Sequence, residues 1–195
     1  MPNAAVGNMA VLSWFAAQAG KDDECRAYAA DVVEAARSSG DVLSSTIAEW
    51  GVGLLDLGLG RADEAVTKLA GLRHPFMALM AAPDLVEAAV RCGRADAAPP
   101  AVAALEAFAA SGAPPWAHGH LARCRGLLEE GEQAEAAFTE AVGTYAEAGA
   151  AFDRGRAELL YGELLRRARQ RSEAREHLRA AADVFARLGA TVWEQ

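Results

Sequence analysis

The amino-acid sequence predicts an all-α solenoid built from about five antiparallel helical hairpins. No proline occurs in residues 3–74 or 116–195, so both stretches can be helical throughout. Alanine dominates a hydrophobic fraction of 52%, whereas aromatic residues make up only 7%, and small side chains favour close contacts between helices. Turn residues divide the chain into segments of helix-hairpin length. These turns are predicted near Gly20, Gly40, Gly60, Gly93, Ser111 with Gly112, Gly131, Gly149 and Gln170.

The hairpins are expected to form a single helical repeat domain over residues 1–195. Pro75, Pro83 and the proline pairs at 99–100 and 114–115 mark helix starts or breaks in the middle of the chain. The expected hairpins span roughly 3–38, 41–72, 76–111, 115–148 and 151–189.

The last hairpin has the clearest pattern, because apolar residues recur at steps of three and four in both of its helices. Ser172 is a plausible N-cap of the second helix, and Gly189 is a plausible C-terminal glycine. The two apolar stripes are Ala157, Leu160, Tyr161, Leu164, Leu165 and Ala168, then Ala174, Leu178, Ala181, Ala182, Phe185 and Leu188.

A small residue in the first helix, followed by alanine, a large apolar residue and alanine in the second, recurs along the chain. The last hairpin has Gly162, then Ala174, Leu178 and Ala181; the second has Gly53, then Ala65 and Leu69; the fourth has Ala134, Phe138 and Ala141. The first and third are degenerate, with Cys25, Ala29 and Val32 in one and Ala98, Val102 and Leu105 in the other.

This pattern resembles tetratricopeptide repeats. The resemblance implies a right-handed α-solenoid of tetratricopeptide-like hairpins, with a concave inner surface lined by the first helices.

Composition and charge narrow the class of function. The formal net charge of -8 disfavours direct binding to DNA or to anionic membrane. No apolar run reaches membrane-spanning length, and no leader pattern marks the chain for export. The three cysteines are far apart, without the spacing of a disulfide framework or a zinc site. We therefore expect a cytoplasmic protein.

No candidate motif supports catalysis, so we expect neither enzyme activity nor a cofactor. The glycines at 51–60 lack the strand and the Gly-Lys-Ser/Thr ending of a phosphate loop. His118 and His120, two apart on a helix, cannot share one metal ion. An all-helical enzyme is the alternative, and it would require a deep pocket with converging titratable groups.

Arginines form one basic concentration, for which a solvated helix face is the first interpretation. The alternative is a docking surface for a neighbouring domain or nucleic acid, and the acidic chain favours the domain. These arginines are Arg166, Arg167, Arg169, Arg171, Arg175 and Arg179, interrupted by Glu173 and Glu176.

Two segments resemble the C-terminal part of the helical arm in large ATP-binding LuxR-family transcription regulators. They are Pro83–Arg94 (PDLVEAAVRCGR) and Phe152–Ala190, which includes LLYGELLRR at 159–167. The family implies a nucleotide-binding module before the arm and a DNA-binding helix-turn-helix after it. This chain lacks a phosphate loop, and Thr191–Gln195 reads like the opening of another helix, so we expect a fragment.

By this resemblance, we expect a sensor arm that binds an effector or partner protein in its concave groove. DNA contact would come only through a helix-turn-helix outside this chain. A free-standing adaptor that acts only by protein binding is the alternative. Uncapped end hairpins also predict a homodimer, without membrane contact. The groove candidates, chosen by helical phase, are Trp14, Trp50, Glu87, Arg91, Arg125, Arg156, Glu163 and Arg166.

Overall fold

The structure, a computed structural model, describes residues 3–193. Within this range the chain forms ten α-helices and two short 3₁₀ helices, and this range contains no strand. The prediction of an all-α fold is therefore confirmed. Contacts divide the chain into two compact units, residues 1–101 and 102–195, and each is described by itself below.

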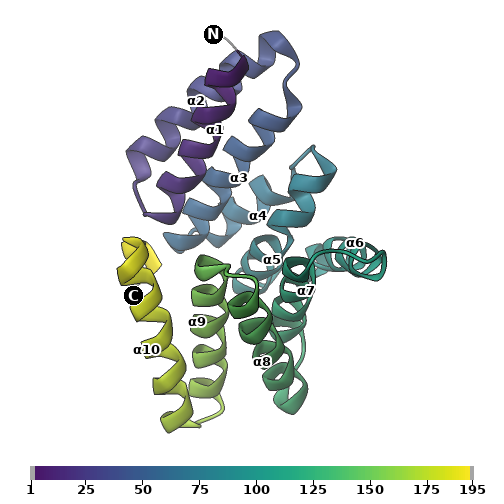
Figure 1. The fold of residues 1–195 in the computed structure, drawn as a ribbon, viewed down its shortest axis with the longest axis vertical. Helices are drawn as coiled ribbons and strands as arrows, with labels where there is room; N and C mark the ends of the chain where they lie inside the picture. The colour runs from purple at the N-terminus through teal and green to yellow at the C-terminus, as the bar shows by residue number, and fades with distance from the viewer. Residues whose placement is uncertain (1–2, 194–195) are drawn as a thin grey trace. The chain divides into compact units, whose positions relative to one another are not determined.

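Unit 1 is an array of neighbouring helices (Figure 1). Helix α1 packs against α2 and α3, and α3 also packs against α4 and α5. A long central helix with neighbours on several sides must be apolar around most of its circumference, and α3 is buried at twelve of its positions. The elements are α1 (Asn3–Gln18), α2 (Asp22–Ser39), α3 (Val42–Gly58), α4 (Ala62–Ala70), α5 (Pro75–Arg91) and η1 (Ala95–Ala97).

Unit 2 contains two long helical pairs, α7 with α8 and α9 with α10, and α8 also packs against α9 (Figure 1). The boundary between the units falls within α6, so it divides the third hairpin expected from the sequence. The elements are α6 (Pro99–Ala110), α7 (Pro115–Leu128), α8 (Gly131–Glu147), α9 (Ala151–Arg167), α10 (Arg171–Leu188) and η2 (Thr191–Trp193). Residues 191–193 thus form a 3₁₀ turn, and Glu194 and Gln195 lie outside the described residues.

Most helices end in the same type of backbone turn. In six turns of the described range, the residue after a left-handed position donates its N–H to the carbonyl five residues before it, which is the Schellman motif. Five of these left-handed positions are glycines, which adopt a positive φ at little cost. They are Gly20, Gly60, Gly93, Gly149 and Gly189, and the sixth position is Arg169.

Helix starts use two other devices. Pro75 and Pro115 occupy the first position of α5 and α7, where a missing N–H is harmless. At α3, the Asp41 carboxylate accepts hydrogen bonds from the backbone N–H and the hydroxyl of Ser44 at 3.0 and 2.6 Å. These bonds lower the pKa of Asp41, with the hydroxyl of Ser44 as the main cause.

Glycines at helix crossings let a large side chain of the next helix approach the backbone. A Cβ atom on Gly53 would lie 2.8 Å from the Leu69 side chain, and one on Gly162 would lie 2.7 Å from that of Leu178. On α7, Gly126 faces Phe138 at 2.8 Å in the same way. Each glycine therefore sets how closely its pair of helices can pack.

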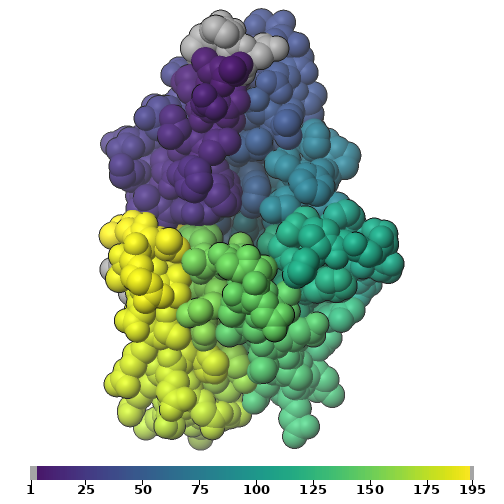
Figure 2. Space-filling view, in the orientation of Figure 1, coloured from purple at the N-terminus to yellow at the C-terminus, as the bar shows by residue number. Residues whose placement is uncertain are grey.

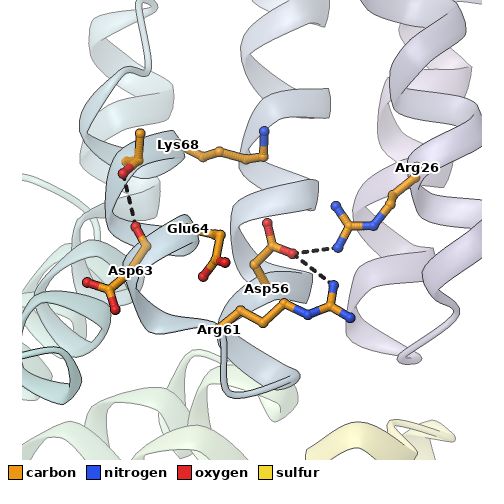
Figure 3. Close-up of a pocket in the computed structure, with 7 residues that line it drawn as sticks. Arg26, Asp56, Arg61, Asp63, Glu64 and Lys68 are labelled. Atoms are coloured by element: carbon orange, nitrogen blue, oxygen red, sulfur yellow. Dashed lines mark hydrogen bonds and ion pairs between the residues drawn. The ribbon is translucent and has the colours of Figure 1, made fainter.

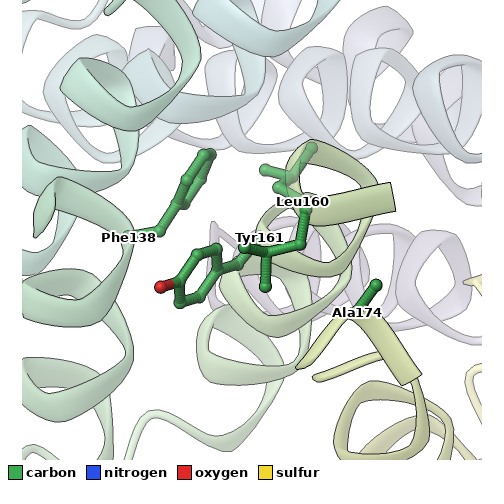
Figure 4. Packing of buried hydrophobic residues seen from close by; sticks show 5 residues of the cluster. Phe138, Leu160, Tyr161 and Ala174 are labelled. Atoms are coloured by element: carbon green, nitrogen blue, oxygen red, sulfur yellow. The ribbon is translucent and has the colours of Figure 1, made fainter. Parts of the chain in front are cut away.

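The core of unit 2 fills the space between these crossings. Tyr161 stacks on Phe138 with ring centroids 5.8 Å apart, and its other neighbour is His177 at 4.2 Å. Leu160, Leu165 and Ala174 complete this cluster (Figure 4). Side chains from three successive helices, α8, α9 and α10, thus share one interior.

Helix α1 is unusual because residues 3–18 carry no charge. Its outward side exposes Val11, Leu12 and Phe15, the last to 54%, and α1 lies uncovered in the space-filling view (Figure 2). Among the described residues, no helix combines the length and the hydropathy needed to cross a bilayer.

Candidate functional site

Unit 1 brings together the two tryptophans that the sequence analysis predicted to line the groove. Trp14 on α1 and Trp50 on α3 have ring centroids 5.3 Å apart. Trp50 is only 8% exposed, and its Nε1 donates a 3.0 Å hydrogen bond to Asp84 on α5. Gly51 lies against the backbone of Trp14, where a Cβ atom would approach to 3.1 Å. The pair therefore connects three helices of unit 1, and Trp50 presents little surface to a ligand.

The other two candidates of unit 1 lie one turn apart on α5. Arg91 donates to the Glu87 carboxylate at 2.9 Å, and Glu87 is fully buried whereas the Arg91 side chain is 38% exposed. Asp84, which accepts from Trp50, precedes Glu87 by three positions on the same side of the helix. Three of the buried or half-buried polar groups of unit 1 thus follow one side of α5.

The sequence analysis missed a charged pocket of about 710 Å³ between α2, α3 and α4 (Figure 3). Asp56, 2% exposed, accepts from Arg26 at 2.5 Å, and Arg61 lies 3.6 Å away. Arg26 also donates to Asp22 at 2.5 Å, and the hydrogen bond to Asp56 is the main cause that raises the pKa of Arg26. The pocket is lined by Arg26, Asp56, Arg61, Asp63, Glu64, Thr67 and Lys68.

The charges of this pocket balance one another, since three basic and three acidic side chains line it. The Asp56 network therefore fits a structural role, in which two arginines compensate a buried carboxylate. The sequence feature that could have predicted this network is Asp56 itself, which lies inside the apolar run LLDLG at 54–58 of α3.

Unit 2 brings together three of its four predicted residues around the end of the last hairpin. Arg156 is fully buried, with its guanidinium carbon 3.4 Å from the ring centroid of Trp193. Trp193 also borders a small hollow between α9 and α10, which Glu163 and Arg166 border as well. We call this hollow the α9–α10 notch. It has a volume of about 240 Å³ and is lined by Leu159, Glu163, Arg166, Leu178, Ala181, Ala182 and Trp193.

The fourth candidate of unit 2, Arg125 on α7, lies apart from the notch. It forms an exposed ion pair with Glu106 on α6 at 3.2 Å. Such a pair contributes little to stability, about 0–1 kcal/mol.

Two histidines of unit 2 each contact a polar side chain. His120 contacts the hydroxyl of Tyr145 at 2.8 Å, and His177 contacts Glu158 at 2.6 Å. Across residues 3–193, no three histidine, cysteine, aspartate or glutamate side chains gather as metal ligands would. Both histidines therefore belong to local polar pairs.

In comparisons with known proteins, no family model, curated protein or solved structure matches this chain.

Proposed function

We propose that this chain is a tetratricopeptide-like interaction arm that recognises a partner by the shape and charge of stacked hairpins. The observation that carries the proposal is a helix crossing that recurs with the same spacing in the second and the last hairpin, whereas the Gly126–Phe138 crossing of the fourth spans twelve positions (138 − 126). Gly53 meets Leu69 and Gly162 meets Leu178, sixteen positions later in both cases (69 − 53 and 178 − 162). The intervening alanines, Ala65 and Ala174, are both buried twelve positions after the glycine.

Equal spacing at equivalent crossings is what a helical repeat requires, because each hairpin must present the same surface to the next. It supports a solenoid of the tetratricopeptide kind, right-handed as the resemblance implies. The sequence resemblance extends the proposal to the sensor arm of a LuxR-family transcription regulator. In that role the arm would bind an effector or partner and act without catalysis or cofactor.

A free-standing adaptor is the second candidate, because the recurrent crossings support a protein-binding scaffold equally well. The encoded reading frame separates the two. A helix-turn-helix after residue 195 supports the regulator arm, and a frame without one supports the adaptor.

Transcription in the native cell tests the arm directly. We expect Arg166→Glu, which reverses a charge at the rim of the α9–α10 notch, to reduce the regulated response several-fold in the full-length protein. Arg37→Glu on α2, also an exposed arginine, is the control. Equal responses of both variants and the parent protein, at equal protein levels, would contradict this placement of the binding surface.

A further inference from the structure

A dense positive surface lies where α9 ends and α10 begins. Its six arginines all have exposed side chains, and no guanidinium group among them bonds to another described residue. Residues 166–179 carry six arginines and two glutamates, a formal charge of +4 (6 − 2) in a chain of net charge -8. We call this the arginine surface: Arg166, Arg167, Arg169, Arg171, Arg175 and Arg179.

One member of this surface occupies a position that favours glycine. Arg169 has φ 64° and is the only non-glycine residue with positive φ within residues 3–193. Its turn has the same two backbone hydrogen bonds as the turns at Gly20, Gly60 and Gly149. An L-residue in this conformation costs folding free energy that glycine would avoid. A positive side chain therefore occupies a turn position whose conformation favours glycine.

The arginine surface adjoins the α9–α10 notch, whose lining combines five apolar residues with the charged Glu163 and Arg166. Arg171, Arg175 and Arg179 follow one side of α10 at steps of four, and α10 is uncovered along one side in Figure 2. Leu178 and Ala182, both in the α9–α10 notch, lie three positions after Arg175 and Arg179. The notch volume of about 240 Å³ is below the range of about 300–1,000 Å³ typical of small-molecule sites. It suits an apolar side chain of a larger partner.

We propose that the arginine surface and the α9–α10 notch together bind an acidic amphipathic helix of a partner protein. Carboxylates at steps of four on such a helix match the spacing of Arg171, Arg175 and Arg179. Guanidinium groups can bind carboxylates through two parallel hydrogen bonds. An apolar side chain on the adjacent helix face enters the notch beside Leu178. This proposal holds for either function considered above.

Charge favours an acidic helix over nucleic acid or anionic membrane. Polyanions contact a long positive tract, whereas the row from Arg171 to Arg179 spans only about two turns of helix, or about 12 Å. Beyond this row, Asp183 interrupts the same side of α10. Unit 2 as a whole carries 11 basic and 14 acidic residues, a net charge of -3 (11 − 14).

Titration with a synthetic helix tests the proposal. The probe is a labelled helical peptide of about 18 residues, with leucines on one face and glutamates at steps of four beside them. Fluorescence anisotropy measures binding to the purified chain. We expect the double variant Arg175→Glu/Arg179→Glu to weaken binding at least about tenfold, and raised salt to weaken binding to the parent chain.

Two further variants separate the apolar and positive parts of the site. Ala182→Glu places a carboxylate in the notch and should weaken binding about tenfold, because its charge opposes the peptide. Arg169→Gly should weaken binding a few-fold without lowering the unfolding temperature, since glycine relieves the positive φ. A turn residue with a purely structural role would leave binding unchanged.

Arg37→Glu on α2 is the matched control and should bind the peptide as the parent chain does. Far-UV circular dichroism checks that every variant is folded. Any one of four results overturns the proposal. These are equal binding by the double variant, equal binding of a scrambled peptide of the same composition, tighter binding to duplex DNA or phosphatidylserine vesicles than to the peptide, and absence of peptide binding at low salt.

Discussion

The crossing of α9 and α10 at Gly162 allows one substitution to be worked through from its contacts. A Cβ atom at position 162 would lie 2.7 Å from Cγ of Leu178, 2.9 Å from its Cδ2 and 3.1 Å from its backbone nitrogen. Leu178 can rotate its side chain, but its backbone nitrogen moves only if α10 moves. Gly162→Ala therefore requires the two helices to separate slightly.

Two opposing effects determine the size of the change. Overpacking of this kind costs about 1–3 kcal/mol. Alanine gains up to about 1 kcal/mol over glycine in a helix interior. With the full gain of alanine subtracted, the net expectation is a loss of about 0–2 kcal/mol in the free energy of unfolding.

Gly143 in α8 provides the matched control, because a Cβ atom there meets nothing within 4 Å. Gly143→Ala should raise the free energy of unfolding by about 0.5–1 kcal/mol. Urea titrations followed by far-UV circular dichroism measure both variants, with the same denaturant slope expected for each. If Gly162→Ala is as stable as Gly143→Ala, the crossing is not close-packed and our reasoning fails.

Two further predictions concern titratable groups of unit 1. Asp41→Ala removes the α3 cap and should lower the free energy of unfolding by about 1 kcal/mol. Because Ser44 lowers the pKa of Asp41, the cap contributes fully above the unfolded-state pKa of about 3.9, and its contribution is lost as the pH falls through the folded-state pKa. Stability curves of parent and variant that stay parallel into the acid range would contradict this prediction. Burial raises the pKa of the Cys25 thiol to about 11, with Asp22 and Asp56 adding to this effect and Arg26 opposing it. At pH 8 a disulfide reagent should therefore modify the half-buried Cys92 long before the buried Cys25. Equal modification rates for the two cysteines would contradict this prediction.

The sequence predicts the elements of this fold well, because its signals are local. Apolar steps of three and four identify buried positions such as Ala65 and Ala174. Glycines at 20, 60 and 149 predict helix ends because left-handed turns favour them. Both kinds of signal depend on neighbours within a few residues along the chain.

The candidate site could be predicted only in part, because its contacts join distant positions. Helical phase selected Glu163 and Arg166, which do border the α9–α10 notch. It could not show that Trp193 folds back to stack on Arg156, since that depends on the path of the 3₁₀ turn. Helical phase also could not show that Asp56 pairs with Arg26 on α2 and with Arg61 at the start of α4, because helical periodicity does not specify which helices pack together.

Main-chain hydrogen bonds close the six Schellman turns, so the geometry of these turns depends little on the side chains at their surface. The residue that donates the closing hydrogen bond uses only its main-chain N–H, so the turn itself does not specify its side chain; lysine, arginine, alanine and glutamine all occur there. Where this residue is exposed, as at Lys21 and Arg94, a substitution can therefore change the charge at one end of a helix while the helices keep their register. A scaffold of this kind can acquire new partners by changing its turns, with its interior left intact.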